Sequence, residues 1–422
     1  MFGGGGGGFQ APKISSIKIS SIGQGTPIPL LFGTARVSPV LIASANFKRK
    51  EVKSPGGKGG GTGGKSYEYS SDLLFAVCEG EIRGYGKAWR DKDRFDTLAD
   101  SGFTFYVNGT IPQLAWGHWV TNVPDKALPY SGTALVAGSA YKLNDGATLG
   151  NHSFEVFGLQ TSATVDAPNH LDAYPKDIIG GFISNPHYGA VDPVSAVLPL
   201  DTTAMHDYCK ARGIVISPLL DSVRPAHEWL AEWAMIANTG IVWSEGVLKF
   251  RPYSDLPYIS AAGSYTPDTA IRYHFDADDG NVWDFVKHDA DKTIDSYNRV
   301  TIECLNRAND YNEFAVTRDD LADIDQKGLR DAPSEKYECI KQPRIAVIVA
   351  LTKLQSVLYR RERYSIVTDC DADLLEPVDF VALTCTPLGL STTRCRVKSI
   401  KDYQEGKLEL IVEEAPTGGY CG

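Results

Sequence analysis

The stretch that decides the fold runs from residue 34 to residue 82 and reads TARVSPVLIASANFK (34–48), RKEVKSPGGKGGGTGGKS (49–66) and YEYSSDLLFAVCEGEI (67–82). In its last part five odd-numbered positions carry apolar side chains, namely Tyr67, Tyr69, Leu73, Phe75 and Val77, and Glu68, Ser70 and Asp72 alternate with them. A period of two is typical of a strand with one buried face. The stretch therefore predicts two strands that are joined by a long hairpin loop at 48–66.

This loop combines glycine with basic residues, and Glu51 is its only acid. Such a segment cannot bury apolar surface, so it stays flexible unless a partner orders it. Two interpretations stay open: a surface insertion without a partner, or a loop that reaches a partner subunit or a polyanion. The GGKS sequence at 63–66 leads into a strand, so it is not a phosphate-binding loop. The candidate subunit-contact residues are Lys48, Arg49, Lys50, Lys53, Lys58 and Lys65.

Length, composition and charge limit the number of domains and the class of protein. Its 422 residues favour two to four domains, and 43% hydrophobic with 22% charged residues is ordinary for a globular protein. The formal net charge of −10 argues against nucleic-acid binding by the protein as a whole, so basic function must be local. The N-terminal MFGGGGGGFQAPK lacks the features of a signal peptide, and the eight cysteines are scattered. We therefore expect folding in a reducing cytoplasm.

Working outward from the hairpin, we expect a flexible glycine-rich arm at 1–16 and a first β-barrel-like domain at 17–165. The proline- and glycine-rich run at 22–33 predicts an extended segment along an edge or between subunits. FTFYVNGTIPQLAW (103–116) predicts a strand, an Asn-Gly turn and a second strand, and HSFEVFGLQ (152–160) predicts a further strand.

Residues 166–265 predict a peripheral α+β domain. A first helix has capping residues at 201–203 and a stop at Gly213, and a second has Ser222 as its cap, Pro225 in its first turn and Gly240 at its end. A hairpin that turns at Glu245-Gly246 follows.

Residues 266–422 predict a second β-rich domain. It begins with SYNRVTIECL (296–305) and continues through an acidic, polar connection at 306–336. One helix is expected at about 344–363, with Arg360, Arg361 and Arg363 in its last turn. Strands separated by turn residues then predict a meander or small barrel. The expected fold class is predominantly β and multidomain.

No catalytic constellation stands out. The sequence has no HExxH pair and no GxSxG elbow, so no catalytic residue is proposed and the protein is not expected to be an enzyme. The spacing of Cys370, Cys385, Cys395 and Cys421 is weak support for a metal or iron–sulfur site, and buried thiols are the favoured interpretation. The acidic turn at 276–279 fits a calcium loop poorly. No cofactor and no metal is therefore expected.

Six segments, taken in order, resemble the baseplate hub or tip-attachment proteins of long-tailed bacteriophages. They are GQGTPIPLLFGTARV, the Gly/Lys loop, YSSDLLFAVCEGEIRGYGKAW, AHEWLAEWAMIANTGIVWSEGVLKFRPY, SYNRVTIECLNRANDYN and LLEPVDFVALT. The resemblance covers about 17–415. It implies a homotrimeric hub with two β-barrel domains in each subunit, which together match the tail tube, and with peripheral α+β domains.

The resemblance also implies a function and partners. The hub would cap the tail tube and open for DNA ejection, and its partners would be the distal tail protein ring, the tube and tape-measure proteins, and tail fibres or receptor-binding proteins. Phage DNA would be met only in transit, and the host membrane would not be bound directly. We expect the protein in the virion, at the tail tip, after assembly in the host cytoplasm.

Members of this family often continue into C-terminal fibre or receptor-binding modules, whereas this sequence ends at Gly422, so scaffold duty is expected rather than direct host recognition. The alternative is a glycan-binding or peptidoglycan-degrading protein built on β-domains, because aromatic-rich surfaces also bind glycans. The missing acid and base pair counts against it.

Overall fold

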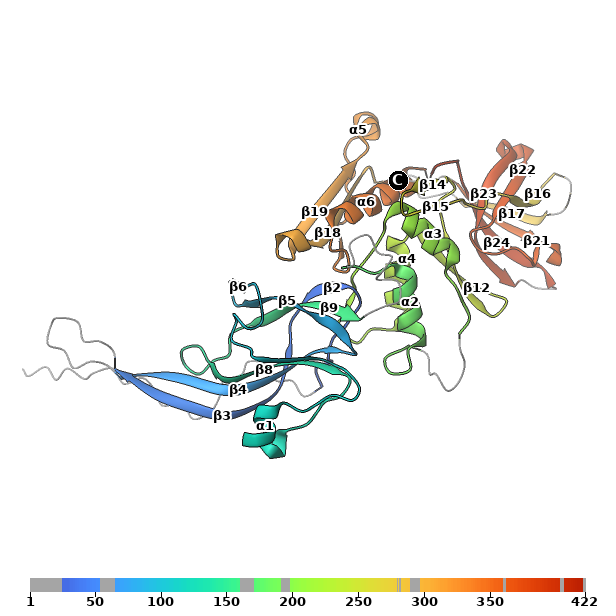
Figure 1. Ribbon diagram of the computed structural model, residues 1–422. Coiled ribbons are helices and arrows are strands. Elements are labelled where there is room, and N and C mark those ends of the chain that lie inside the picture. The colour runs from blue at the N-terminus through green and yellow to red at the C-terminus, as the bar shows by residue number, and fades with distance from the viewer. Residues whose placement is uncertain are drawn as a thin grey trace, which may run out of the picture. The chain divides into compact units, whose positions relative to one another are not determined.

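The computed structural model describes residues 25–53, 65–159, 171–190, 198–278, 280, 282–288, 297–359, 362–402 and 406–419. The chain divides into two compact units. Unit 1 comprises Met1–Gln160 with Pro218–Val223, and unit 2 comprises Thr161–Ser217 with Arg224–Gly422 (Figure 1). Both are rich in β-structure, as the sequence predicts. The domain limits expected from composition stay a prediction.

Unit 1 contains two four-stranded sheets and a short antiparallel pair. The pair joins β1 (Leu30–Leu31) to β11 (Leu219–Leu220). The first sheet has the order β2 (Thr34–Val37), β9 (His152–Leu159), β5 (Ile82–Arg90) and β6 (Asp93–Phe95). The second has the order β3 (Val40–Lys53), β4 (Lys65–Glu79), β8 (Thr133–Lys142) and β7 (Phe105–Asn108). A short helix, α1 (Gly117–Asn122), and a 3-10 turn (Pro124–Lys126) lie between β7 and β8.

Alternating side chains of both sheets form the main core of unit 1. Leu73, Phe75 and Val77 of β4, which the sequence places on one face, are buried there beside Phe154 and Val156 of β9. The opposite face of β4 packs against a second apolar cluster that includes two tryptophans from α1 and its N-cap. Leu73, Phe75 and Val77 thus share a buried face as predicted, but the other face of β4 is buried as well, so the prediction of a strand with one buried face is wrong.

The run TARVSPVLIASANFK forms two strands rather than one. Thr34–Val37 pairs with β9 in one sheet, and the chain then changes sheets at Ser38-Pro39 so that β3 pairs with β4 in the other. Proline lacks the N–H that would continue a ladder, which explains the break. The prediction of a single first strand is therefore wrong, and the break lets one run contribute to both sheets.

The second strand expected after Asn108-Gly109 is also absent. The chain does turn at Gly109, whose φ is 85°, but residues 110–116 form no strand, and β7 pairs with β8 instead. At Gly109 a Cβ atom would lie 2.3 Å from the Gly80 carbonyl oxygen. Glycine is therefore needed there for close backbone approach as well as for its conformation.

Unit 2 contains four groups of strands and five α-helices among its described residues. The helices are α2 (Pro175–Ser184), α3 (Thr203–Arg212), α4 (Ala226–Ile236), α5 (Leu321–Lys327) and α6 (Pro343–Tyr359). A three-stranded sheet has the order β10 (Leu200–Asp201), β13 (Val247–Pro252) and β12 (Thr239–Ser244), and β14 (Tyr258–Ser260) pairs with β15 (Gly263–Tyr265). Another three-stranded sheet has the order β19 (Asn312–Asp319), β18 (Arg299–Asn306) and β20 (Glu335–Tyr337).

The α+β part of unit 2 confirms several local predictions. Gly213 ends α3 in the left-handed conformation, and the hairpin of β12 and β13 turns at Glu245-Gly246, where both φ values are positive. The limits of α4 differ from the prediction, because Pro225 rather than Ser222 is the N-cap. The helix ends at Ile236, and Asn238 reverses the chain with a φ of 50°, so that Gly240 lies within β12.

Two predictions for the last third are wrong. The expected polar connection at 306–336 contains β19, α5 and β20, which pair with or follow β18. Only Val316 of the eight residues of β19 is buried, so no apolar alternation marks this strand. The helix after Pro343 ends at Tyr359, and Arg363 begins β21 rather than closing the helix.

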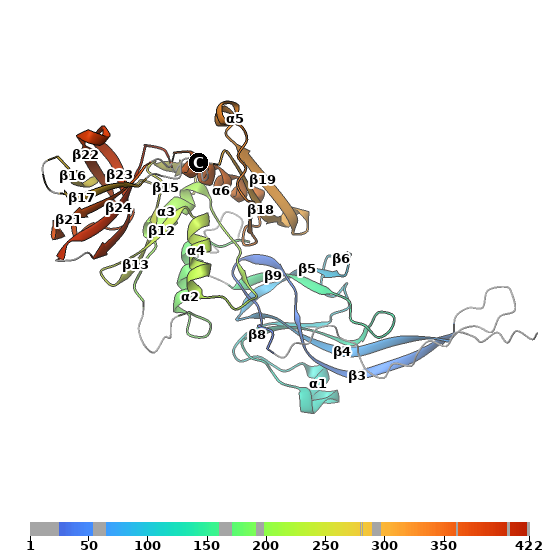
Figure 2. The ribbon, with the colours of Figure 1, turned by 180° about the vertical axis from the view of Figure 1, so that it is seen from behind.

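The C-terminal part of unit 2 is a six-stranded sheet (Figure 2). Its order is β16 (Ile271–Asp276), β22 (Phe380–Cys385), β23 (Leu390–Asp402), β24 (Leu408–Glu414), β21 (Arg363–Thr368) and β17 (Val282–His288). Only β16 runs parallel to its neighbour. One apolar core, with Phe275, Ile366, Leu383 and Leu410, lies against this sheet. The predicted meander from β22 to β24 is present, whereas closure of either unit into a barrel stays a prediction.

Candidate interaction surface

The predicted loop at 48–66 is, at both ends, part of a regular ribbon. Strand β3 continues to Lys53 and β4 starts at Lys65, with Lys48 opposite Ser70 and Lys50 opposite Glu68. Figure 1 shows the two strands running side by side beyond the end of β8. The prediction that the loop begins at 48 is therefore wrong. The hydrogen-bond ladder fixes the backbone there although the side chains are exposed and charged.

One face of this ribbon is basic, and we call it the basic face; it consists of Lys48, Lys50, Glu68 and Lys142. Residues directly opposite in a ladder share a face, and Lys142 of β8 is opposite Ser70. The Lys142 Nζ lies 3.2 Å from Glu68 Oε1. Together with Arg49 and Tyr69 these residues surround an open hollow of about 530 Å³. Since the three lysines outnumber the one carboxylate, the face has a net positive charge.

The other face of the ribbon is aromatic and joins the core. Phe47 stacks on Tyr69 with ring centroids 5.8 Å apart, and the Arg49 guanidinium lies 5.3 Å from the Tyr67 ring centroid. Cation–π contacts of this kind are worth about 0.5–1 kcal/mol at exposed sites. This face therefore anchors the ribbon and leaves the basic face for solvent or a partner.

A buried carboxylate, Asp72, fixes the point where the ribbon begins. Its oxygens accept hydrogen bonds from the Ala140 backbone N–H at 2.8 Å and from Asn46 Nδ2 at 2.7 Å, and His118 Nε2 lies 2.9 Å away. Burial alone would raise the pKa of Asp72, but these bonds outweigh it and hold the pKa below its usual value. Bulges in β3 and β4 flank Asp72. The carboxylate thus satisfies backbone and side-chain groups where the ladders are interrupted.

The structure brings together only part of the predicted set. Lys48, Arg49 and Lys50 lie on adjacent positions of β3, and Lys53 and Lys65 are opposite each other where the described ribbon stops. Lys58 lies outside the described residues. Sequence reasoning missed Lys142 and Glu68, because Lys142 reaches the surface through a pairing of strands about 70 residues apart. No local signal could have indicated that pairing.

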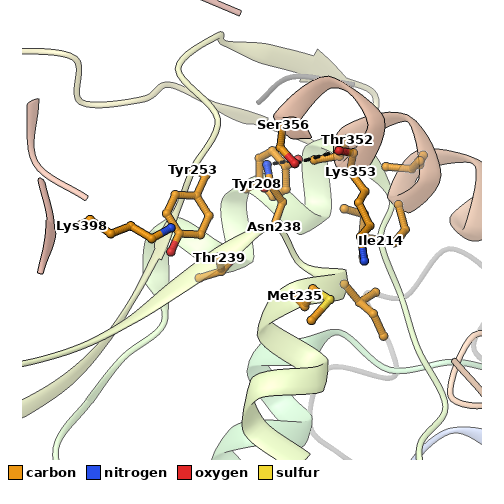
Figure 3. A pocket seen from close by; sticks show the side chains of 13 residues that line it. Tyr208, Ile214, Met235, Asn238, Thr239, Tyr253, Thr352, Lys353, Ser356 and Lys398 are labelled. Carbon is orange, nitrogen blue, oxygen red and sulfur yellow. Dashed lines mark hydrogen bonds between the residues drawn. The ribbon is translucent and has the colours of Figure 1, made fainter. Parts of the chain in front are cut away.

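A second feature is a cavity of about 280 Å³ inside unit 2. It is bounded by α3, the end of α4, β12 and one side of α6, and Figure 3 shows Met235 of α4 and Lys353 of α6 extending toward each other. The walls include Ile214, Ile236 and Ile348. Thr352 is 7% exposed, and its hydroxyl has no hydrogen-bond partner among the described residues. The cavity is therefore an apolar pocket with one hydroxyl left over for a further contact.

Within the described ranges, no group of three or more His, Cys, Asp or Glu side chains is arranged so that it could hold a metal ion. Cys385 and Cys395 are buried, and Cys370 is exposed, while Cys421 lies outside those ranges. Burial raises the pKa of Cys395 to about 12, which keeps it a thiol at neutral pH. Among the described helices, none has the length and apolar character needed to cross a membrane.

Residues 225–400 match a family described as putative phage tail protein. The fold is similar to that of a chain from the virion of a native gene transfer agent particle, with a TM-score of 0.65 and 17% identity. That similarity covers 97% of this chain and 89% of the other. A search of curated proteins finds no match.

A further solved structure is the 43 kDa tail protein of prophage MuSo2 from Shewanella oneidensis. It matches with 11% identity and a TM-score of 0.35, over 92% of this chain and 97% of the other. The resemblance to phage tail proteins thus has independent support over residues 225–400, and the fold as a whole is similar to that of the chain from the gene transfer agent particle.

Proposed function

We propose that this chain is a subunit of the homotrimeric hub at a phage tail tip, where it caps the tail tube and opens for DNA ejection. The observation that carries the proposal is the fold shared over 97% of the chain with a protein of a virion particle. The family match at 225–400 supports a structural role in a tail. Within the virion, the distal tail protein ring, tube and tape-measure proteins and tail fibres would surround the hub. No catalytic activity is part of this proposal.

In this hub the basic face of the β3–β4 ribbon contacts an acidic neighbouring subunit. A channel that must pass DNA is poorly served by lysines, because each lysine held against phosphate releases counterions and retards the polymer. The three lysines of the basic face are exposed on a chain whose net charge is −10, so acidic partners are available in other copies. Exposed pairs contribute only about 0–1 kcal/mol each, but copies on a symmetric ring can add up.

Native mass spectrometry of the purified protein and symmetry analysis of electron micrographs of tail tips would test the hub. We expect a homotrimer, and three copies at the tip of each virion inside a larger ring. A stable monomer that is absent from virions would contradict the proposal. If the protein were found elsewhere in the tail, it would still have a structural role there, but it would not be the hub.

A further inference from the structure

Two segments of unit 1 that contain no charged residue present large apolar side chains to solvent. Residues 101–117 and 127–141 contain no Asp, Glu, Lys or Arg. Within them Leu114 is 85% exposed, Ile111 67% and Leu128 56%. Single exposed apolar residues are ordinary, but a group of them in charge-free segments has the composition of an interface centre. We call these three residues the apolar knob.

The knob is held rigidly by one buried amide, Gln113. Its Oε1 accepts a hydrogen bond from the Gly109 N–H at 2.9 Å, and its Nε2 donates to the carbonyls of Pro129 and Thr133, each at 3.0 Å. These bonds join the Leu114 segment to the Leu128 segment. Because a loop already fixed in one conformation loses little entropy on binding, the knob is preorganised for a contact.

The α3–α4–α6 cavity of unit 2 has the complementary chemistry. A water molecule occupies about 30 Å³ in the liquid, and each carbon atom of an aliphatic side chain needs a similar volume. The cavity volume of about 280 Å³ is therefore large enough for a side chain of four carbon atoms. Met235, which is 51% exposed, offers an adaptable thioether at the opening. The Thr352 hydroxyl is unpartnered among the described residues and could bond to the backbone of an inserted loop.

We propose that Leu114 of one copy inserts into the α3–α4–α6 cavity of a second copy of this chain. Because the knob and the cavity are different surfaces of the same polypeptide, the contact is head-to-tail, and repetition of such a contact closes into a ring when the rotation permits. The inference rests on the proposed hub, because it supplies the contact that builds its ring. It is separate from the basic face, which has neither apolar anchor nor enclosed pocket.

A mixing experiment tests the head-to-tail geometry with two variants. Leu114→Asp removes the knob and keeps the cavity, and Met235→Glu adds a charge to the cavity opening and keeps the knob. Each variant alone should lose self-association at least tenfold by sedimentation, since each copy lacks one half of every contact. Mixed one to one, the variants should form a dimer and nothing larger, because one functional contact remains. Leu374→Asp, at a side chain that is 86% exposed, is the matched control and should assemble normally.

The contact between Leu114 and the cavity can also be tested with a photo-crosslinking residue in place of Leu114. This second test detects the contact even if the mixed dimer is too weak for sedimentation. Mixed with isotope-labelled wild-type chain, it should form adducts with the labelled chain at Met235, Lys353 or Ser356. Circular dichroism checks that each variant is folded, and Ser356→Trp, which fills the cavity, serves as a second pocket variant. Adducts only within one chain, or at other surfaces, would overturn the proposal. A normal wild-type trimer without the mixed dimer or the adducts would overturn it too, and would leave the hub intact.

Discussion

The two units use charge in opposite ways. In unit 1 two sheets enclose an apolar core, and the lysines of the basic face point outward from a ribbon. In unit 2 several small sheets are connected by ion pairs with little solvent access. Asp172, only 1% exposed, pairs with Arg307 and also accepts a hydrogen bond from Gln342 Nε2 at 2.7 Å. Charges that satisfy one another inside unit 2 stabilise its architecture, whereas Lys48 and Lys50 of the basic face are exposed to solvent.

A second group of ion pairs also connects separate parts of unit 2. Glu376, in the loop before β22, lies 2.6 Å from Lys249 Nζ and 2.7 Å from an Arg251 guanidinium nitrogen, both on β13. Burial would raise the pKa of Glu376, but the hydrogen bond from Lys249 and the nearby cations lower it. Ion pairs thus link the sheet of β10, β13 and β12 to the loop that precedes β22 of the six-stranded sheet.

Asp172→Ala should have the largest effect, because it leaves the mostly buried Arg307 without its carboxylate partner. Removing one member of a buried pair costs about 3–5 kcal/mol. Urea unfolding followed by the fluorescence of Trp229 and Trp233, both buried in unit 2, would measure the loss. The exposed Asp207→Ala provides the control in the same unit. Equal losses for the two variants would show that unit 2 does not depend on its internal charges.

Lys341, buried in unit 2, predicts a dependence on pH. Burial is the main cause that lowers its pKa from 10.5 to about 8. Between these values the unfolded chain binds the extra proton, so stability should rise as pH increases from about 8 to 10.5. Below pH 8 the full penalty of the buried ammonium is present. Lys341→Met should therefore be more stable than the wild type at pH 7 by up to a few kcal/mol.

The difference in unfolding free energy between Lys341→Met and the wild type should shrink across that pH window. Urea titrations at pH 7, 8, 9 and 10 would follow it. A constant difference would mean that Lys341 has an ordinary pKa in the folded protein.

The smallest effect on stability should come from the basic face. Changing Lys48, Lys50 and Lys142 together to Ser should leave unit 1 folded within about 0.5 kcal/mol, since these side chains are exposed. Assembly of tail tips should fall at moderate salt and differ less at high salt, where both forms are screened. Extending the change to Lys53, Lys58 and Lys65 should enlarge the deficit.

Electron microscopy of particles assembled at two salt concentrations would measure this deficit. The matched control replaces the exposed lysines Lys92, Lys126 and Lys401 by Ser. Normal assembly with a specific failure of DNA ejection would place the ribbon at the channel instead.

Local signals were sufficient for much of the fold and for little of the surface. The left-handed Gly213, the Glu245-Gly246 turn and the shared face of Leu73, Phe75 and Val77 depend on residues close in sequence, and all three were predictable. The pairing of β18 with β19 and β20 was not, because β19 buries only Val316 of its eight residues and β20 has only three residues, so neither shows an apolar period. Lys142 joined the basic face, and Gln113 came to hold the knob, only through tertiary contacts between segments that no local pattern connects.

The pairing of β1 with β11 has a consequence for the order in which the protein can be made. Leu30–Leu31 must wait for Leu219–Leu220, so unit 1 cannot be completed while the ribosome is still translating the intervening part of unit 2. Domains usually fold as units during synthesis, N-terminal first. Here the first unit to emerge can be completed only after residue 223 has left the ribosomal exit tunnel. Until then the strand at Leu30–Leu31 lacks its pairing partner, and it can pair with nascent chains that are translated from the same messenger RNA.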